Sequence, residues 1–242
     1  MKAMILAAGL GTRLRPLTDN RPKALVEVAG HTLLEIALLR LRTFGVSDVI
    51  INVHHFAAMV VEYLKANGNF GMRIEVSHED VLLDTGGGLK KAAHFFANPA
   101  SDEPFILHNV DVISAIDLRR MLQFHLEHKA LATLAVQDRE TLRYLLFDEQ
   151  HQLCGRRSGQ EAELIRPSQT TQALAFCGIH VISLRLLAML KEGGAFSIID
   201  PYLRLASAGE RILAFRADEY HWRDLGRPDS VVRATHELQQ KA

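Results

Sequence analysis

The sequence predicts an α/β protein with a doubly wound, mostly parallel sheet and a small inserted antiparallel lobe. Short unbroken apolar runs, typical of strands buried on both faces, occur at residues 4–8 and 49–53. Segments with apolar residues at helical spacing alternate with these runs, as at residues 33–44. Such alternation is typical of βαβ units, in which helices cover both faces of parallel strands.

The first half of the chain, residues 1–136, repeats this unit. After the strand at 4–8, three more alternations of strand and helix follow. The expected strands are 49–53, 73–76 and 105–107, and the expected helices are 33–44, 56–66 and 88–96. Ligands of such sheets bind beyond the carboxyl ends of the strands. The loop at Gly9, the segment at Asp84 and residues 109–111 should therefore meet in one cleft.

The second half, residues 137–242, does not continue the regular alternation of strand and helix. Strands are expected at 143–147 and 174–182, around a polar stretch at 156–163 that is typical of an exposed loop, and this arrangement predicts the inserted lobe. The remaining expected elements are helices at 184–190 and 198–206, a strand at 212–215 and a final amphipathic helix from about Asp229. Because no repeat or linker interrupts the chain, we interpret residues 1–242 as a single domain.

Composition argues against several classes of partner. The 242 residues are 48% hydrophobic, and 28 basic side chains balance 28 acidic ones, so no global field favours nucleic acid or an anionic membrane. The two cysteines, Cys154 and Cys177, have no spacing typical of a metal site, and no leader or 18-residue apolar stretch occurs. We therefore expect a cytoplasmic monomer or small homo-oligomer that binds neither nucleic acid nor membranes.

The loop after the first strand has the features of a triphosphate cradle. Gly9 and Gly11 let the backbone turn sharply and approach an oxyanion, so that consecutive N–H groups can converge on phosphate oxygens. Arg13, Arg15 and Lys23 supply countercharge. A tight surface turn would also explain the two glycines, but it would leave these cations unexplained.

Two common phosphate-binding motifs do not match this loop. A dinucleotide fingerprint requires glycine where Leu14 stands and a helix where Pro16 interrupts the chain. A Walker loop requires Gly-Lys followed by Ser or Thr, which is absent here. The loop therefore belongs to another class.

Residues 5–25 read Ile-Leu-Ala-Ala-Gly-Leu-Gly-Thr-Arg-Leu-Arg-Pro-Leu-Thr-Asp-Asn-Arg-Pro-Lys-Ala-Leu. This run resembles, without a gap, the signature Ala-Ala-Gly-x-Gly-Thr-Arg-Leu-x-Pro-Leu-Thr followed by Pro-Lys of the nucleotide-sugar pyrophosphorylases, or sugar-1-phosphate nucleotidylyltransferases. The resemblance implies a Rossmann-like nucleotidyltransferase fold with a nucleotide-binding first half and a sugar-binding lobe in the second. It also implies transfer of a nucleotidyl group from a nucleoside triphosphate to a sugar 1-phosphate, with release of pyrophosphate.

The resemblance assigns roles to residues of the signature and of the segments that should meet it. Arg13 and Lys23 would be catalytic. The implied nucleotide-binding residues are Leu6, Ala8, Gly9, Gly11, Thr12, Arg13, Glu79, Thr85, Gly86, Gly87 and Asn109. Among these, Gly86 and Gly87 belong to a run of three glycines that should open a helix and offer unhindered N–H groups to base, ribose or phosphate.

Two aspartates are the candidate metal ligands. Mg²⁺ prefers oxygen ligands, usually one or two carboxylates with phosphates and waters. Asp111 follows an apolar strand, although Val110 replaces the usual glycine before it, and Asp224 lies in Trp-Arg-Asp-Leu-Gly-Arg-Pro, which resembles the family's Trp-x-Asp-x-Gly-Thr motif. The resemblance implies that these two carboxylates bind one Mg²⁺.

The sugar phosphate would be held by Lys23 and by residues of the second half. Many relatives carry Glu-Lys-Pro before the strand that ends the sugar lobe, and this chain has Ile165, Arg166 and Pro167 there. Arg166 would supply the charge, with a different reach and geometry from lysine. Gly178, in a segment resembling the family's Gly-Ile/Leu-Tyr strand, would admit the sugar.

Several functional alternatives stay open on the sequence alone. The glycine-rich segment resembles short N-acetylmuramate-1-phosphate uridylyltransferases and, nearly as well, mannose- and heptose-1-phosphate guanylyltransferases, so both UTP and GTP are candidates. A catalytically silent nucleotide-sugar sensor could share the fold but would not need both aspartates. An enzyme for phosphocholine and CTP would need an aromatic cage, and residues 164–182 offer only Phe176. We expect no hexapeptide-repeat β-helix domain, and therefore no acetyltransferase activity of the kind found in longer relatives.

Overall fold

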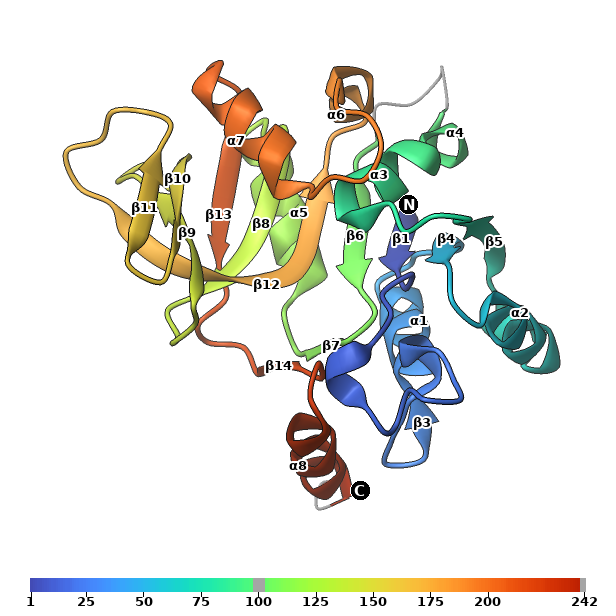
Figure 1. The fold of residues 1–242 in the computed structure, drawn as a ribbon. Helices are drawn as coiled ribbons and strands as arrows, with labels where there is room; N and C mark the ends of the chain where they lie inside the picture. The colour runs from blue at the N-terminus through green and yellow to red at the C-terminus, as the bar shows by residue number, and fades with distance from the viewer. Residues whose placement is uncertain (98–102, 240–242) are drawn as a thin grey trace.

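The computed structural model describes residues 1–97 and 103–239, which form a mixed sheet with helices on both faces (Figure 1). Four neighbouring strands are parallel, in the order β6 (Phe105–Asn109), β1 (Lys2–Leu6), β4 (Asp48–Val53) and β5 (Arg73–His78). Burial of β1, β4 and β6 explains their apolar sequences, because both faces of the sheet are covered there, whereas the edge strand β5 is partly exposed. The predicted doubly wound, mostly parallel core is therefore confirmed.

The second half extends the sheet with antiparallel strands. The long strand β12 (Gln172–Ile182) lies antiparallel to β6 and to β8 (Ala132–Gln137), and β13 (Ile212–Arg216) lies parallel to β8. The first residues of β12 pair with β9 (Arg143–Phe147), which continues into β10 (Leu153–Ser158) and β11 (Glu161–Leu164). Strands β9 to β11 form the inserted antiparallel lobe, at the left in Figure 1.

Two hydrophobic layers sandwich the sheet. The first contains α1 (Leu33–Thr43), α2 (Ala57–Ala66), α5 (Leu118–Glu127) and α8 (Pro228–Gln239). The second contains α3 (Asp84–Lys91), α4 (Ala93–Phe96), α6 (Arg185–Met189) and α7 (Ile199–Ser207). Along β1, Ala3 and Ile5 face the first layer while Met4 faces the second, which is the alternation that a strand buried on both sides requires.

Short elements connect these layers. They are the 3₁₀ turns η1 (Thr12–Leu14), η2 (Lys23–Leu25) and η3 (Gly68–Gly71) and the strands β2 (Glu27–Val28), β3 (His31–Thr32), β7 (Val112–Ser114) and β14 (Trp222–Asp224). Thr32 is the N-cap of helix α1, since its Oγ1 accepts a hydrogen bond of 3.1 Å from the N–H of Glu35. Within the described ranges, no helix combines the length and apolarity needed to cross a membrane.

The structure corrects some expected elements. The stretch 156–163 is not a loop: it forms the adjoining ends of β10 and β11, which turn at Gly159 with φ of 59°. Both faces of this hairpin carry polar side chains, so no apolar alternation marked it as strand. Strand β8 and helix α5 were not expected from the sequence. Helix α3 begins at Asp84 rather than at Gly88.

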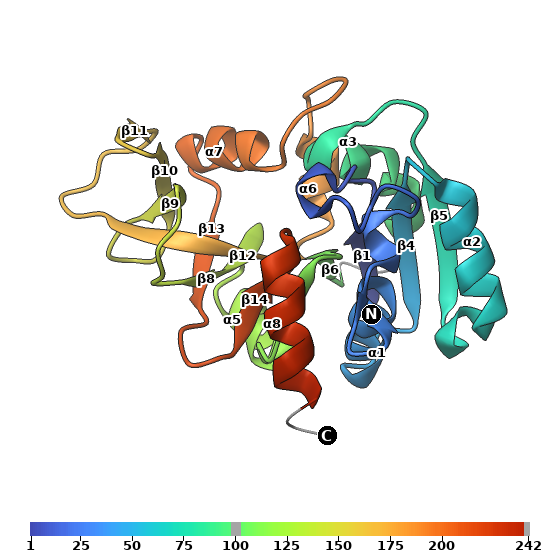
Figure 2. The ribbon, with the colours of Figure 1, turned by 60° about the horizontal axis from the view of Figure 1, so that its bottom comes forward.

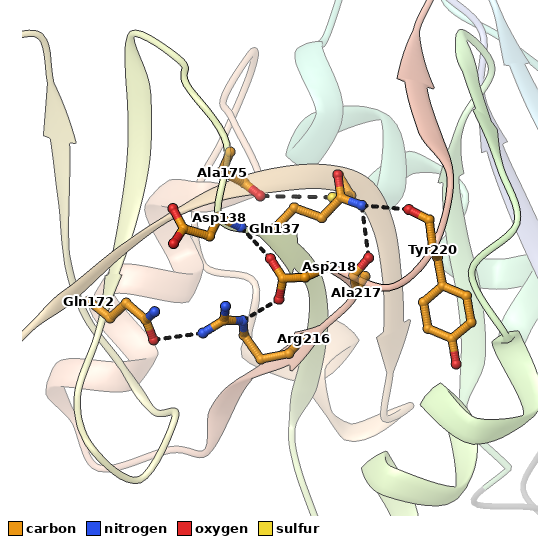
Figure 3. A network of polar contacts seen from close by, with 9 residues as sticks. Gln137, Asp138, Gln172, Ala175, Arg216, Ala217, Asp218 and Tyr220 are labelled. Atoms are coloured by element: carbon orange, nitrogen blue, oxygen red, sulfur yellow. Dashed lines mark hydrogen bonds and ion pairs between the residues drawn. The ribbon is translucent and has the colours of Figure 1, made fainter.

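A polar network fixes the connection from β13 to β14 (Figure 3). The side-chain amide of Gln137, at the end of β8, donates to the carbonyls of Ala217 and Tyr220 at 2.8 and 2.9 Å. Asp218 accepts from the N–H of Asp138 and from Arg216, each at 2.6 Å. Burial alone would raise the pKa of Asp218, but these donors lower it overall. The network therefore positions the segment that leads into β14.

Candidate active site

The signature loop is held in a conformation that only glycine fits at one position. Gly11 has φ of 66°, and a Cβ there would lie 2.9 Å from Cγ2 of Thr18. Thr18 donates its hydroxyl proton to the carbonyl of Gly11 at 2.8 Å, closing the loop. Gly9 has open space around it. The loop therefore combines one conformationally required glycine with one that leaves room for a ligand.

A buried hydrogen-bond chain ties the start of this loop to α3. The N–H of Ala7 donates to Oδ1 of Asn52 at 2.7 Å, and Nδ2 of Asn52 donates to Oε1 of Glu79 at 2.8 Å. The other Glu79 oxygen accepts from the N–H of Leu83 at 3.0 Å. Glu79 is only 1% exposed. Its carboxylate links β4, β5 and α3, and the sequence analysis missed the part played by Asn52.

Two of the three glycines of α3 allow close packing against residues 194–196, while Gly88 packs against Asn52 and Glu79. A Cβ at Gly86 would lie 2.3 Å from the ring of Phe196, and one at Gly87 would lie 2.6 Å from the carbonyl oxygen of Gly194. The N–H groups of Gly86 and Gly87 donate to the carbonyl of Phe196 at 2.9 and 3.3 Å. The expectation that these N–H groups are unhindered is therefore wrong. The hydroxyl of Thr85 likewise accepts from the N–H of Ile198 at 2.9 Å.

The fold brings together the two aspartates that lie 113 positions apart. Strands β7 and β14 pair antiparallel, with Asp224 opposite Val112, and the N–H of Leu225 donates to the carbonyl of Asp111 at 2.8 Å. Lys23 from η2 makes an ion pair with the carboxylate of Asp111, and both side chains are largely buried, with exposed fractions of 12% and 14%. Three segments thus converge beyond the carboxyl ends of β1 and β6.

Arg13 reaches the same place from η1. A Cβ at Gly226 would lie 3.2 Å from Nη2 of Arg13 and 2.6 Å from Oδ1 of Asp224, so the guanidinium and the carboxylate flank the same glycine. The N–H of Gly226 also donates to that carboxylate. We refer to Arg13, Lys23, Asp111 and Asp224 as the charged cluster.

Gly178 lies beside the cluster on β12. Its φ is 74°, and a Cβ would lie 2.9 Å from Nδ2 of Asn109 and 2.8 Å from Cγ2 of Val112. The indole N–H of Trp222 donates to the carbonyl of Cys177 at 2.7 Å. Any side chain at position 178 would therefore fill the space next to Asn109.

Arg139, which sequence reasoning missed, lies against Trp222. Its guanidinium stacks 3.8 Å from the centre of the Trp222 ring and donates to the carbonyl of Phe176 at 2.9 Å. No sequence motif identified Arg139. It follows β8, and only the folded chain brings residues of β12 and β14 next to it. Arg166 lies elsewhere: its Nη1 is 3.8 Å from Oδ2 of Asp148, in the outer part of the lobe. The structure does not bring Arg166 to the charged cluster.

Two neutral histidines lie beneath the site. His108 on β6 is fully buried, with Nδ1 2.8 Å from the carbonyl oxygen of Asn109 and no partner for Nε2. Burial lowers the pKa of His108 to about 4. His180 on β12 lies 3.0 Å from the hydroxyl of Tyr202, and burial lowers the pKa of His180 to about 3. Both side chains are therefore uncharged at neutral pH.

The donor set of the charged cluster fits Mg²⁺. In the described part of the chain, no group of three or more His, Cys, Asp or Glu side chains could hold a metal ion. Asp111 and Asp224 lie on adjoining backbone segments and each offers hard carboxylate oxygens, and Mg²⁺ commonly takes one or two carboxylates while phosphates and waters complete its shell. The ion pair with Lys23 shows that the Asp111 carboxylate accepts a cation in this position.

Comparisons with known proteins agree with this geometry. The family model described as nucleotidyl transferase matches residues 2–241. The chain is 34% identical to an N-acetylmuramate alpha-1-phosphate uridylyltransferase of Caulobacter vibrioides, over 98% of this chain and 96% of that protein. It is 28% identical to a mannose-1-phosphate guanylyltransferase of Mycobacterium tuberculosis, over 98% of this chain but 64% of that protein.

Solved structures show the same fold at lower sequence identity. HddC from Yersinia pseudotuberculosis, in complex with GMP-PN, is 20% identical and superposes with a TM-score of 0.77, covering 98% of this chain and 99% of that one. A UDP-glucose pyrophosphorylase in complex with UDP-glucose is 17% identical and superposes with a TM-score of 0.80, covering 100% of this chain and 99% of that one. These similarities confirm the nucleotidyltransferase fold that the signature implied.

Proposed function

We propose, from the premise that the chain belongs to the nucleotidyl transferase family and is a sugar-1-phosphate nucleotidylyltransferase, that it joins UTP to N-acetylmuramate 1-phosphate and releases pyrophosphate. The observation that carries the proposal is the convergence of Arg13, Lys23, Asp111 and Asp224 beyond the carboxyl ends of β1 and β6. The relative that matches along nearly its whole length supports the choice of substrates, because its name specifies that sugar phosphate and a uridylyl group.

The reaction is an in-line displacement at the α-phosphorus. A phosphate oxygen of the sugar 1-phosphate forms the new P–O bond, and the bond to the β-phosphate oxygen breaks with its electron pair, so pyrophosphate leaves. The attacking phosphate is already ionised and needs no general base. The protein's task is to align two polyanions and to neutralise their repulsion.

The charged cluster has the groups for that task. Arg13, beside the open loop at Gly9, would neutralise charge on the α-phosphate and on the leaving pyrophosphate. Lys23 would bridge the α-phosphate and the sugar phosphate from its position at Asp111. Asp111 and Asp224 would hold Mg²⁺, which when bound supplies further neutralisation of phosphate charge.

The nucleotide would lie along the signature loop and the start of α3. Leu6, Ala8 and Asn109 lie at or just beyond the paired ends of β1 and β6, within reach of the same ligand as Gly9. Residues 194–198 contact the start of α3. They would therefore form part of the surface against which base and ribose bind. Glu79 would support this surface through Asn52 and Leu83.

GTP with mannose or heptose 1-phosphate is the second candidate. The Mycobacterium tuberculosis relative named as a guanylyltransferase is similar along 98% of this chain, at 28% identity. The four side chains of the charged cluster serve either nucleotide equally, because they face phosphates rather than the base.

The test is pyrophosphate release with Mg²⁺ from UTP, GTP, CTP, ATP and dTTP. Each is paired with the 1-phosphates of N-acetylmuramate, N-acetylglucosamine, mannose, heptose and glucose. Release with UTP and N-acetylmuramate 1-phosphate, with the nucleotide sugar identified by mass, is the expected result. Turnover only with GTP would establish the second candidate. No turnover from any pair, in protein that binds a nucleotide, would overturn both and favour a silent sensor.

A further inference from the structure

A cavity of about 780 Å³ lies between the antiparallel lobe and the beginning of α7. One wall is the sheet of β9, β10 and β11, and the opposite wall is formed by Ser197, Ile199 and Asp200. Figure 2 shows the lobe and α7 next to each other, at the left of the molecule. A cavity of this size can hold a substituted pyranose ring.

Strand register decides which lobe side chains share the cavity face. Arg143 pairs with Ser158, and Ser158 pairs with Glu161, so these three residues form one row across the three strands. Leu145, Arg156 and Glu163 form the neighbouring row. Because directly paired residues point to the same side of a sheet, Arg143 and Glu161 face the same side as Arg156, about 10 Å from each other.

The charges on this face are not equally available. Arg156 donates to Glu163 at 2.7 Å and to Asp200 at 2.9 Å, so its charge is already matched by two carboxylates. Arg143 has no carboxylate partner among the residues that the structure describes, and Glu161 has no cationic one. The face therefore presents one unpaired guanidinium on β9 and one unpaired carboxylate on β11.

Arg143 stands at the end of the cavity that is nearer to the charged cluster. The last paired residues of β9 and β12 are Leu145 and Leu174, so continuing this antiparallel register places Arg143 near Phe176. Phe176 also lines the cavity and precedes Gly178 by two residues, a separation of at most about 7 Å. Gly178 touches Asn109, beside the charged cluster. A sugar whose phosphate lies at Lys23 can thus extend from Gly178 toward Arg143.

We propose that Arg143 selects sugar 1-phosphates whose ring carries a carboxylate-bearing substituent, by binding this carboxylate in the lobe cavity. Guanidinium groups bind carboxylates with paired, charge-assisted hydrogen bonds. Glu161, on the far side of the same face, accepts hydrogen bonds from ring hydroxyl or amide groups. The inference rests on the proposed function, because it concerns the sugar-binding part of that same site.

The experiment compares two substrates that differ only by a carboxylate-bearing group. N-acetylmuramate 1-phosphate is N-acetylglucosamine 1-phosphate with a lactyl ether, so the ratio of their kcat/KM values isolates recognition of that group. For the wild type we expect a ratio well above ten in favour of the acidic sugar. Arg143→Gln should lower this ratio by roughly 10- to 100-fold, the typical value of one hydrogen bond to a charged group. Arg143→Lys should restore part of it.

Arg211→Gln is the matched control, because Arg211 is an exposed arginine outside the cavity and should leave the ratio unchanged. Circular dichroism verifies that each variant is folded. An equal loss on both sugars in Arg143→Gln would mean that Arg143 holds the phosphate, and it would overturn the inference. A wild type that turns over both sugars equally would overturn it as well, while leaving the proposed function intact. Absence of turnover with every pair would instead be a failure of the proposed function.

Discussion

The charged cluster and the antiparallel lobe are built in opposite ways. Lys23 and Asp111 are 12% and 14% exposed and form an ion pair, and the N–H of Leu225, just after β14, donates to the carbonyl of Asp111. In the lobe, Arg156 and Glu163 are 45% and 55% exposed, and the adjoining cavity faces solvent. Interactions that stabilise charge in a reaction gain strength when water is excluded, while exposed ion pairs contribute little. The comparison suggests that reaction chemistry depends on the buried cluster and substrate choice on the exposed lobe.

The largest expected effect comes from the charged cluster. Asp111→Asn and Asp224→Asn should each lower kcat by about 10² to 10³, because each removes one charge at the site where two polyanions meet. The measurement is steady-state pyrophosphate release at saturating substrates. Arg73→Asn is the control: it removes an 82% exposed guanidinium on the edge strand β5 that pairs with Asp48 on β4, and it should change kcat less than about twofold. If the aspartate variants matched this control, the cluster would not be the reaction centre.

The packing of α3 should give the next largest effect. Gly86→Ala places a methyl group 2.3 Å from the Phe196 ring, so either the ring or residues 194–197 must move. We expect a loss of about 1 to 3 kcal/mol in the free energy of unfolding, measured by urea denaturation. Gly193→Ala is the matched control, since no atom lies within 4 Å of its Cβ position. Equal stabilities of the two variants would contradict the tight fit described here.

Acid should destabilise the part of the sheet beneath the cluster. His108 and His180 have folded pKa values of about 4 and 3, against 6.5 for an ordinary histidine. Between pH 6.5 and about 4 the unfolded chain binds protons that these folded histidines do not, so stability falls as pH falls. The slope is up to about 1.4 kcal/mol per pH unit for each histidine. Urea denaturation from pH 4.5 to 7.5 measures it.

The variant His180→Gln tests whether His180 contributes to this loss of stability in acid. His180→Gln removes the titrating group but retains an amide near the hydroxyl of Tyr202. Its stability should vary less steeply with pH than that of the wild type. An unchanged slope would show that other groups control acid unfolding.

The smallest effect is expected from Arg166 in the lobe. Its guanidinium is 27% exposed and lies 3.8 Å from Asp148, beyond hydrogen-bonding distance. Arg166→Gln should change the free energy of unfolding by less than about 1 kcal/mol and kcat/KM for the sugar phosphate less than about threefold. A loss of about 100-fold, as for a phosphate contact, would restore the role that the sequence resemblance assigned to Arg166 and would contradict the division of labour between lobe and cluster.

The strands of the two regions differ in how visible they are in the sequence, for a physical reason. Strands β1 and β4 are buried on both faces, so their apolar runs reveal them directly. The hairpin of β10 and β11 has polar side chains on both faces, and its strands exist because they pair with β9 and with each other. Tertiary pairing, rather than local preference, made those residues strand.

The sequence by itself determined the family and the fold class, and it supplied the candidate residues for neutralising phosphate charge, because these depend on residue types at short spacings. Only the tertiary structure decided which of these groups meet. It joined Asp111 to Asp224 through β7 and β14, turned Arg166 toward Asp148, and engaged the α3 glycine N–H groups with Phe196. Such contacts span from 18 to more than 100 residues, and they depend on strand register and helix packing, which no local pattern encodes.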